Sequence, residues 1–230
     1  MQPRFVGRLS LADAVTVANA ALGFLAAAAA TTSPTLAARL ILLAAIADGL
    51  DGVVARKVGS SAAGSYLDSL ADVASFGVAP ALTVTVVAGE AWTFASRPVL
   101  FVLAYALPAA FVAMAVVRLG LYTAYDSGTD ETEGAPTTLA STILAAGILA
   151  GFLTPLVLVG LAGLLAALMV TTVTYPDLHA QDALVMGVVQ VLAVVLTGRW
   201  GEVFAFAILF LSLAYLVLGP AFYWRNSISA

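Results

Sequence analysis

The amino-acid sequence predicts an all-α protein, a polytopic transmembrane helix bundle of about eight spans. Of its 230 residues, 62% are hydrophobic and only 10% are charged, whereas soluble domains average about 45–50% apolar and about 25% charged residues. Apolar stretches recur along the whole chain, and most approach the roughly 20 residues that a helix needs to cross a bilayer. We therefore expect one integral-membrane domain that covers residues 1–230.

Each expected helix corresponds to one of these apolar stretches. The longest run, residues 138–173, is too long for one span, and Pro155 near its middle removes a backbone donor and so interrupts a helix. Dividing the run at this point gives eight spans, which cover residues 11–32, 36–54, 65–88, 98–121, 137–153, 156–173, 182–197 and 201–219.

The distribution of basic residues predicts the orientation of the bundle, because cytoplasmic loops carry an excess of Lys and Arg. With the N-terminus inside, six basic residues lie on the cytoplasmic side (Arg4, Arg8, Arg56, Lys57, Arg118 and Arg225) and three on the outer side (Arg39, Arg97 and Arg199). We therefore expect a multi-pass protein of the cell membrane with both termini in the cytoplasm.

Composition also excludes several partners and metal sites. A net charge of -4 argues against a nucleic-acid partner, which requires a basic surface. The chain has no cysteine and a single histidine, His179, so neither thiolates nor a histidine cluster can bind a metal. Carboxylates remain, and they favour hard cations such as magnesium, manganese or calcium.

Four aspartates are concentrated where the second and third spans meet. Asp48 and Asp51 lie three residues apart, and Asp68 and Asp72 lie four residues apart, so each pair shares one helix face. The short loop between the spans makes them antiparallel neighbours, and the carboxylates can converge at the cytoplasmic end. Four such charges repel one another, and two divalent cations would compensate them. A pair of cations is the clamp used for phosphoryl displacement.

The residues around these aspartates favour a ligand site. Gly52 and Gly64 would let a large ligand approach the backbone, and Arg56 has the donor geometry to bind a phosphate. The alternative is that the aspartates are helix-end charges exposed to the cytoplasm and paired with Arg56 and Lys57. Four acids in register with two glycines and an arginine favour the site.

The pattern D-x2-D-G-x2-A-R, followed by a short spacer and G-x3-D-x3-D, resembles the signature of the CDP-alcohol phosphatidyltransferases. The spacer between Arg56 and Gly64 is seven residues long, one residue shorter than in the family members that the pattern resembles. The signature is met at Asp48, Asp51, Gly52, Ala55, Arg56, Gly64, Asp68 and Asp72.

Three further stretches resemble the serine-specific branch of that family, the phosphatidylserine and archaetidylserine synthases. They are S-F-G-V-A-P at 75–80, G-A-P-T-T at 134–138 and L-M-V-T-T-V-T-Y-P at 168–176. Thr138 replaces a proline of the family pattern, and Thr174 replaces an arginine. The alternative for each stretch alone is helix packing by small residues.

Two other features bear on this resemblance. Asn19 and Gly23 in the first span fit the family's N-x3-G pattern. After the fourth span, Arg118 keeps the first basic residue of a pattern like R-L-A-R-F-N, whereas Leu121 replaces the second. Arg118 is thus our candidate contact for the acceptor's carboxylate or a phosphate, with a plain positive-inside anchor as the alternative.

The resemblance implies transfer of a lipid phosphoryl group from CDP-diacylglycerol or CDP-archaeol to the hydroxyl of L-serine, with release of CMP. It implies two Mg2+ or Mn2+ ions per site and a homodimer at the membrane. By the same resemblance, Asp48, Asp51, Asp68 and Asp72 are metal ligands, with Asp72 also the general base. Gly52, Ala55, Arg56 and Gly64 would bind the CDP-lipid.

Three alternatives remain at this point. The same fold could use another acceptor, such as glycerol 3-phosphate or inositol phosphate, although few basic residues are available for a phosphorylated one. A cation transporter could use the four aspartates for coupling, but we see no inverted repeat of the kind such transporters contain. A non-catalytic membrane scaffold would leave the acid quartet unexplained.

Overall fold

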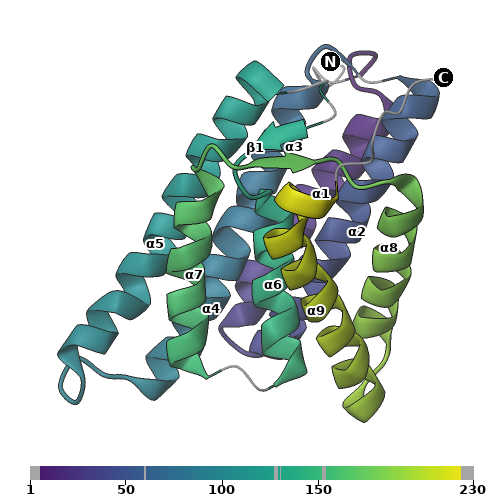
Figure 1. The fold of residues 1–230 in the computed structure, drawn as a ribbon. Helices are drawn as coiled ribbons and strands as arrows, with labels where there is room; N and C mark the ends of the chain where they lie inside the picture. The colour runs from purple at the N-terminus through teal and green to yellow at the C-terminus, as the bar shows by residue number, and fades with distance from the viewer. Residues whose placement is uncertain (1–5, 60, 127–128, 130, 152–153, 224–230) are drawn as a thin grey trace.

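The computed structural model describes residues 6–59, 61–126, 129, 131–151 and 154–223, with the backbone alone for Arg56, Val58 and Ala180. Arg4 and Arg225, which contributed to the predicted orientation, lie outside these ranges. Over the described residues the chain is a bundle of helices packed side by side (Figure 1).

Eight helical segments follow one another along the described chain. They are α1 (Leu11–Ala30); α2 (Pro34–Val58); α3 (Gly64–Asp72), continued by the π-helix η1 (Val73–Val78) and by α4 (Ala79–Ala91); α5 (Pro98–Leu121), continued by the π-helix η2 (Tyr122–Asp126); α6 (Thr137–Ala150); α7 (Pro155–Met169); α8 (Ala180–Val195); and α9 (Gly198–Phe222).

These segments confirm the predicted all-α bundle and match the predicted stretches in order. Four helices among the described residues are long and apolar enough to cross a membrane: 11–30, 64–91, 98–126 and 198–222. The helices α6, α7 and α8 are shorter, with 14, 15 and 16 residues. The number of membrane crossings therefore stays a prediction.

Local sequence explains where several helices begin. Ser10 caps α1 in a capping box, in which the Ser10 backbone N–H donates to Asp13 Oδ2 at 2.5 Å and the Asp13 N–H donates to Ser10 Oγ at 3.2 Å. Thr154 caps α7, and Pro155 is its first residue, a position where the missing N–H costs nothing. The predicted division of the long apolar run at Pro155 is thus confirmed.

Four helices end two to four residues earlier than predicted. We predicted spans to 32, 153, 173 and 197, but α1 ends at Ala30, α6 at Ala150, α7 at Met169 and α8 at Val195. After α7 comes a β-branched run, which favours extended backbone. It forms β2 (Thr174–Pro176), which pairs antiparallel with β1 (Glu131–Glu133). No pattern in the sequence predicted this sheet.

Two apolar clusters hold the bundle together. One joins α4, α5, α6, α7 and α9 around fully buried side chains that include Phe111 and Ile143. The other joins α1, α2, α4, α6, α8 and α9, largely through alanines, so the helices approach closely. The helix α6 contributes to both clusters and is central (Figure 1).

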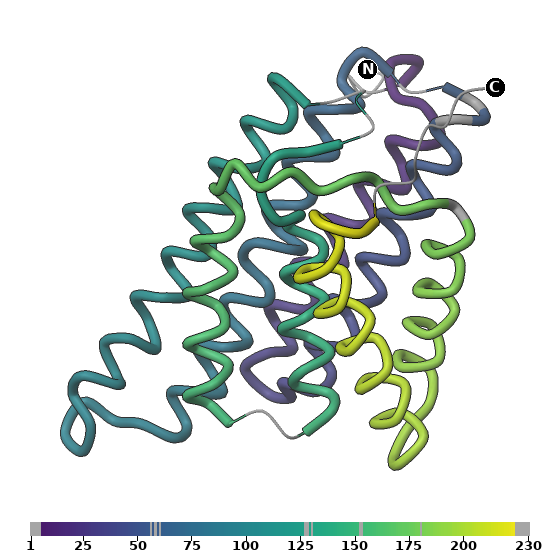
Figure 2. Tube along the Cα trace, in the orientation of Figure 1, coloured from purple at the N-terminus to yellow at the C-terminus, as the bar shows by residue number. Residues whose placement is uncertain are grey.

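The path of the chain brings the helix ends that carry the signature to one end of the bundle. The start of α1, the end of α2, the start of α3 and the end of α9 lie at the same end as β1 and β2 (Figures 1 and 2). Functional residues that are distant in sequence can therefore meet there.

Candidate active site

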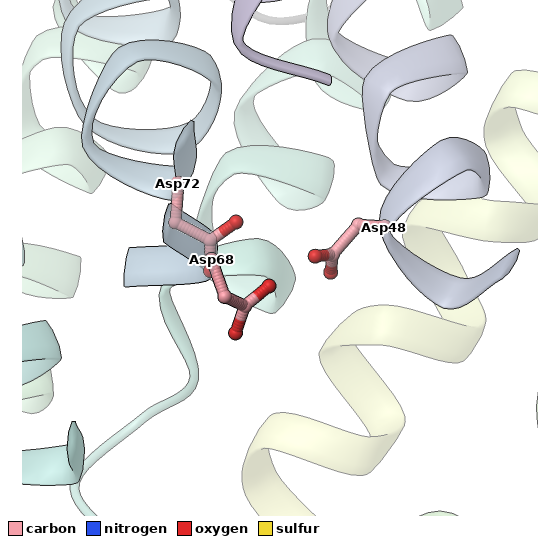
Figure 3. Close-up of side chains that lie close together, drawn as sticks. All are labelled: Asp48, Asp68 and Asp72. Atoms are coloured by element: carbon pink, nitrogen blue, oxygen red, sulfur yellow. The ribbon is translucent and has the colours of Figure 1, made fainter. Parts of the chain in front are cut away.

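The aspartates of the signature lie on two facing helices. Asp48 is on α2, and Asp68 and Asp72 are one turn apart on α3. Their carboxylates point toward one another across the gap between the two helices (Figure 3). Three of the four carboxylates predicted to converge therefore do so, which follows from the i, i+4 spacing and the short α2–α3 loop.

These three carboxylates form a group able to hold a cation. Asp48, Asp68 and Asp72 each offer one oxygen, and the three oxygens lie within 4.8 Å of one another. Asp72 is buried, with 7% of its surface exposed. Within the part of the chain that the structure describes, no Lys, Arg or His nitrogen lies within 4.0 Å of the group. Lys57, the one of the two partners in the helix-end alternative whose side chain the structure describes, therefore does not pair with these acids.

Asp51 lies beside this group but faces a different helix. Its Oδ2 accepts a hydrogen bond of 2.8 Å from the Thr16 hydroxyl of α1, and both residues are buried. The charge of Asp51 still acts on Asp68 and Asp72. The fourth carboxylate of the signature is thus next to the other three, with one of its oxygens already occupied.

The first helix also contacts the base candidate. Asn19 Nδ2 lies 3.5 Å from Asp72 Oδ1, at the long end of the hydrogen-bond range. Asn19 is fully buried, and the Ser75 hydroxyl donates to its backbone carbonyl at 2.8 Å. A Cβ at Gly23 would lie only 2.6 Å from Ser75 Oγ, so this close approach of α1 to η1 requires glycine.

The residues predicted to bind the CDP-lipid flank the acid group. Gly52 and Ala55 lie on α2 after the aspartates and are half-buried, and Gly64 is the first residue of α3. Arg56 lies on α2, but its side chain is outside the described part. Their binding roles stay predictions.

Arg118 lies near the end of α5, and its side chain is buried, with 7% of its surface exposed. Its guanidinium donates to Thr132 Oγ1 on β1 at 3.1 Å and lies 5.3 Å from the centre of the Tyr122 ring. Among the described residues, its Nε has no hydrogen-bond partner. The charges of Arg118 and Asp72 interact, so the cation belongs to the surroundings of the acid group.

Two residues of this neighbourhood were missed by the sequence analysis. Thr16 binds Asp51, and Thr132 connects Arg118 to Asp126, whose Oδ2 accepts from the Thr132 hydroxyl at 3.1 Å. The only available signal for Thr16 was its spacing of three residues from Asn19, which places both on one helix face.

The fold and the site define the class of this protein: a helical membrane enzyme with three clustered aspartate carboxylates at one end of its bundle. The family model for CDP-alcohol phosphatidyltransferase matches residues 9–175. The chain belongs to this family, as its signature indicated.

Similar proteins include serine-specific members of the family. An archaetidylserine synthase of Methanothermobacter thermautotrophicus is 30% identical over 179 residues, which cover 76% of this chain and 73% of that protein. A CDP-diacylglycerol–serine O-phosphatidyltransferase of Methanocaldococcus jannaschii is 47% identical over 74 residues, 32% of this chain and 34% of that protein. An enzyme of the same name from Mycobacterium bovis is 41% identical over 124 residues, 52% of this chain and 40% of that protein.

Proposed function

We propose that this enzyme transfers the lipid phosphoryl group of a CDP-lipid, CDP-diacylglycerol or CDP-archaeol, to the hydroxyl of L-serine. The serine oxygen forms a bond to the lipid-side phosphorus, the bond from that phosphorus to CMP breaks, and the serine proton passes to the enzyme. The observation that carries the proposal is the carboxylate group of Asp48, Asp68 and Asp72 within the family's signature. The serine-specific names of the relatives support the choice of acceptor.

The carboxylates fit divalent cations. Three converging oxygens without a basic partner among the described residues are a suitable ligand set for a hard cation. We assign Asp48, Asp51, Asp68 and Asp72 as ligands of two Mg2+ or Mn2+ ions. Such ions, when bound, neutralise charge on the pyrophosphate and on the leaving CMP.

Asp72 is our candidate for the general base. It is the last acid of the signature, and its carboxylate lies among the other acids. The Asn19 amide lies 3.5 Å from one Asp72 oxygen. The other oxygen would take the proton from the serine hydroxyl as the hydroxyl oxygen attacks the phosphorus.

Arg118 is our candidate for the serine carboxylate. Its buried guanidinium is held by Thr132, and its Nε has no hydrogen-bond partner among the described residues. A buried donor without a partner is costly, and a carboxylate would provide the acceptor with two oxygens matched to the guanidinium fork. A carboxylate contact at Arg118 would favour an amino acid over an acceptor that has no carboxylate.

The donor would occupy the other side of the acid group. Gly52, Ala55, Arg56 and Gly64 would bind the cytidine diphosphate, and the lipid chains would extend between the helices into the bilayer. We further propose a homodimer in the cell membrane, with the site at the cytoplasmic face and both termini in the cytoplasm. A site at the membrane surface lets one enzyme reach a lipid donor and a soluble amino acid.

A transfer assay on purified protein tests this function. CDP-lipid and Mn2+ are combined with labelled serine, glycerol 3-phosphate or inositol phosphate in separate reactions, and CMP release and labelled lipid are measured. We expect incorporation of serine alone, its loss in EDTA, and its return with Mn2+ or Mg2+. Incorporation of another acceptor would overturn the serine assignment, and transfer in metal-free buffer would overturn the two-metal assignment.

A further inference from the structure

The helix α1 directs two buried polar side chains at the two helices that carry the signature. Thr16 binds Asp51 of α2, and Asn19 approaches Asp72 of α3. The signature itself lies wholly within α2 and α3, so α1 is a third element of the site. Thr16 is the stronger of these contacts, because its hydrogen bond is shorter.

The Thr16 hydroxyl has two acceptors for its one proton. Ala12 carbonyl oxygen, one turn earlier on α1, lies at 3.2 Å, and Asp51 Oδ2 lies at 2.8 Å. The carboxylate is both nearer and charged, and hydrogen bonds to charged acceptors are the stronger ones. The proton therefore belongs mainly to the bond with Asp51.

This bond fixes the direction of the Asp51 carboxylate. The three-acid group does not include Asp51 among its members, although Asp48 and Asp51 share a face of α2. One Asp51 oxygen is turned to α1, and a carboxylate has about four acceptor positions, so the remaining ones stay available for a cation. The other described contact of this carboxylate is the backbone of the adjacent Gly52 on α2, so the Thr16 hydroxyl is the partner that directs it toward a second helix.

We propose that Thr16 is a positioning residue that holds Asp51 for cation binding. The inference rests on the proposed metal role of Asp51 and extends it to a residue outside the signature. Partners of metal ligands of this kind orient the ligand, and their loss typically weakens metal affinity by about 10- to 100-fold. Thr16 acts through Asp51 and does not touch the reacting atoms.

The test measures binding of Mn2+ alone to purified protein, by electron paramagnetic resonance, without donor or acceptor. Thr16→Val removes the hydroxyl with little change in shape, and Thr16→Ser restores it. Thr83→Val is the matched control, because Thr83 is also fully buried in a helix and its hydroxyl donates to the carbonyl of Ala79, four residues earlier. Thr83 thus reproduces the packing and the backbone contact of Thr16 without the carboxylate.

We expect Thr16→Val to weaken Mn2+ binding by about 10-fold or more, while Thr16→Ser and Thr83→Val bind Mn2+ as the parent does. Transfer by Thr16→Val should recover when Mn2+ is raised. Equal Mn2+ affinity of Thr16→Val and Thr83→Val would overturn the inference. If the valine variants are not monodisperse, Thr16→Ala and Thr83→Ala give the same comparison.

The outcome is separable from that of the proposed function. A protein that binds Mn2+ in a Thr16-dependent way but incorporates a different acceptor would retain this inference and lose the serine assignment. A parent protein that binds no Mn2+ would overturn both the two-metal assignment and the role of Thr16.

Discussion

Two groups of acidic side chains near the same end of the bundle have opposite surroundings. One carboxylate oxygen each of Asp48, Asp68 and Asp72 lies within 4.8 Å of the other two, and no basic nitrogen lies within 4.0 Å of them in the described part of the chain. Asp182, at the start of α8, is 53% exposed, lies 3.8 Å from His179 Nδ1 and accepts a hydrogen bond from the Tyr223 hydroxyl. The first group has its charge left for a ligand to neutralise, whereas Asp182 already has protein partners and water.

The surroundings of an acidic side chain therefore distinguish a candidate site residue from a structural one better than its charge alone does. The centre of the His179 ring also lies 5.0 Å from that of Tyr223, with the two rings tilted by 50°, and the His179 backbone N–H donates to the Tyr223 hydroxyl. These contacts tie the segment before α8 to the end of α9. Asp182 is thus part of a surface connection, and its removal should leave the chemistry intact.

Replacing Asp72 should have the largest effect on the reaction. Asp72→Asn keeps the shape but cannot take a proton, and a general base contributes roughly 100- to 10,000-fold. We expect CMP release to fall by about this factor while binding of the CDP-lipid is largely retained. Asp182→Asn, the same change at the exposed group, should release CMP at the parent rate. Near-parent turnover by Asp72→Asn would remove Asp72 from the role of base.

A change at Arg118 should have an intermediate effect confined to the acceptor. Arg118→Lys keeps the charge but loses the planar fork that matches a carboxylate. A lost hydrogen bond to a charged group costs about 1.5–3 kcal/mol, so we expect the KM for serine to rise by roughly 10-fold or more, with the KM for CDP-lipid unchanged. The kcat at saturating serine should remain close to the parent value.

Arg39→Lys provides the control for that experiment. Arg39 is a partly buried arginine that donates to the Val194 carbonyl at 2.6 Å and connects α2 to α8 away from the acid group. Its replacement should leave both KM values unchanged. An equal rise of both KM values in Arg118→Lys would contradict an acceptor role and indicate a general distortion of the site.

The sequence predicted those parts of the site that depend on spacing within one helix. Asp68 and Asp72 are four residues apart, and the short loop from α2 brings Asp48 to them. Side-chain direction within a helix and the antiparallel pairing of consecutive helices are local properties, so a single sequence contains them. The eight helical segments were predictable for the same reason.

The parts that sequence did not predict depend on partners distant in the chain. Thr16 and Asp51 are 35 residues apart, and no pattern around either indicates their bond. The strands β1 and β2 have three residues each, too few for a period to be recognised. Without that sheet, the position of Thr132 beside Arg118 could not be expected.

Thermal stability should show the smallest effect of the comparison, but with opposite signs for the two groups. Asp182→Asn removes an exposed pair worth at most about 1 kcal/mol, so in EDTA its Tm should fall by no more than about 2–4 °C. Asp72→Asn removes a buried acidic side chain whose charge is disfavoured beside two other acids, so in the same buffer its Tm should rise. With saturating Mn2+, the Tm of the parent should exceed that of Asp72→Asn, because the parent then binds the cation through all its carboxylates. A fall of the Asp72→Asn Tm in EDTA would contradict the view that the Asp72 carboxyl destabilises the fold when no metal is bound.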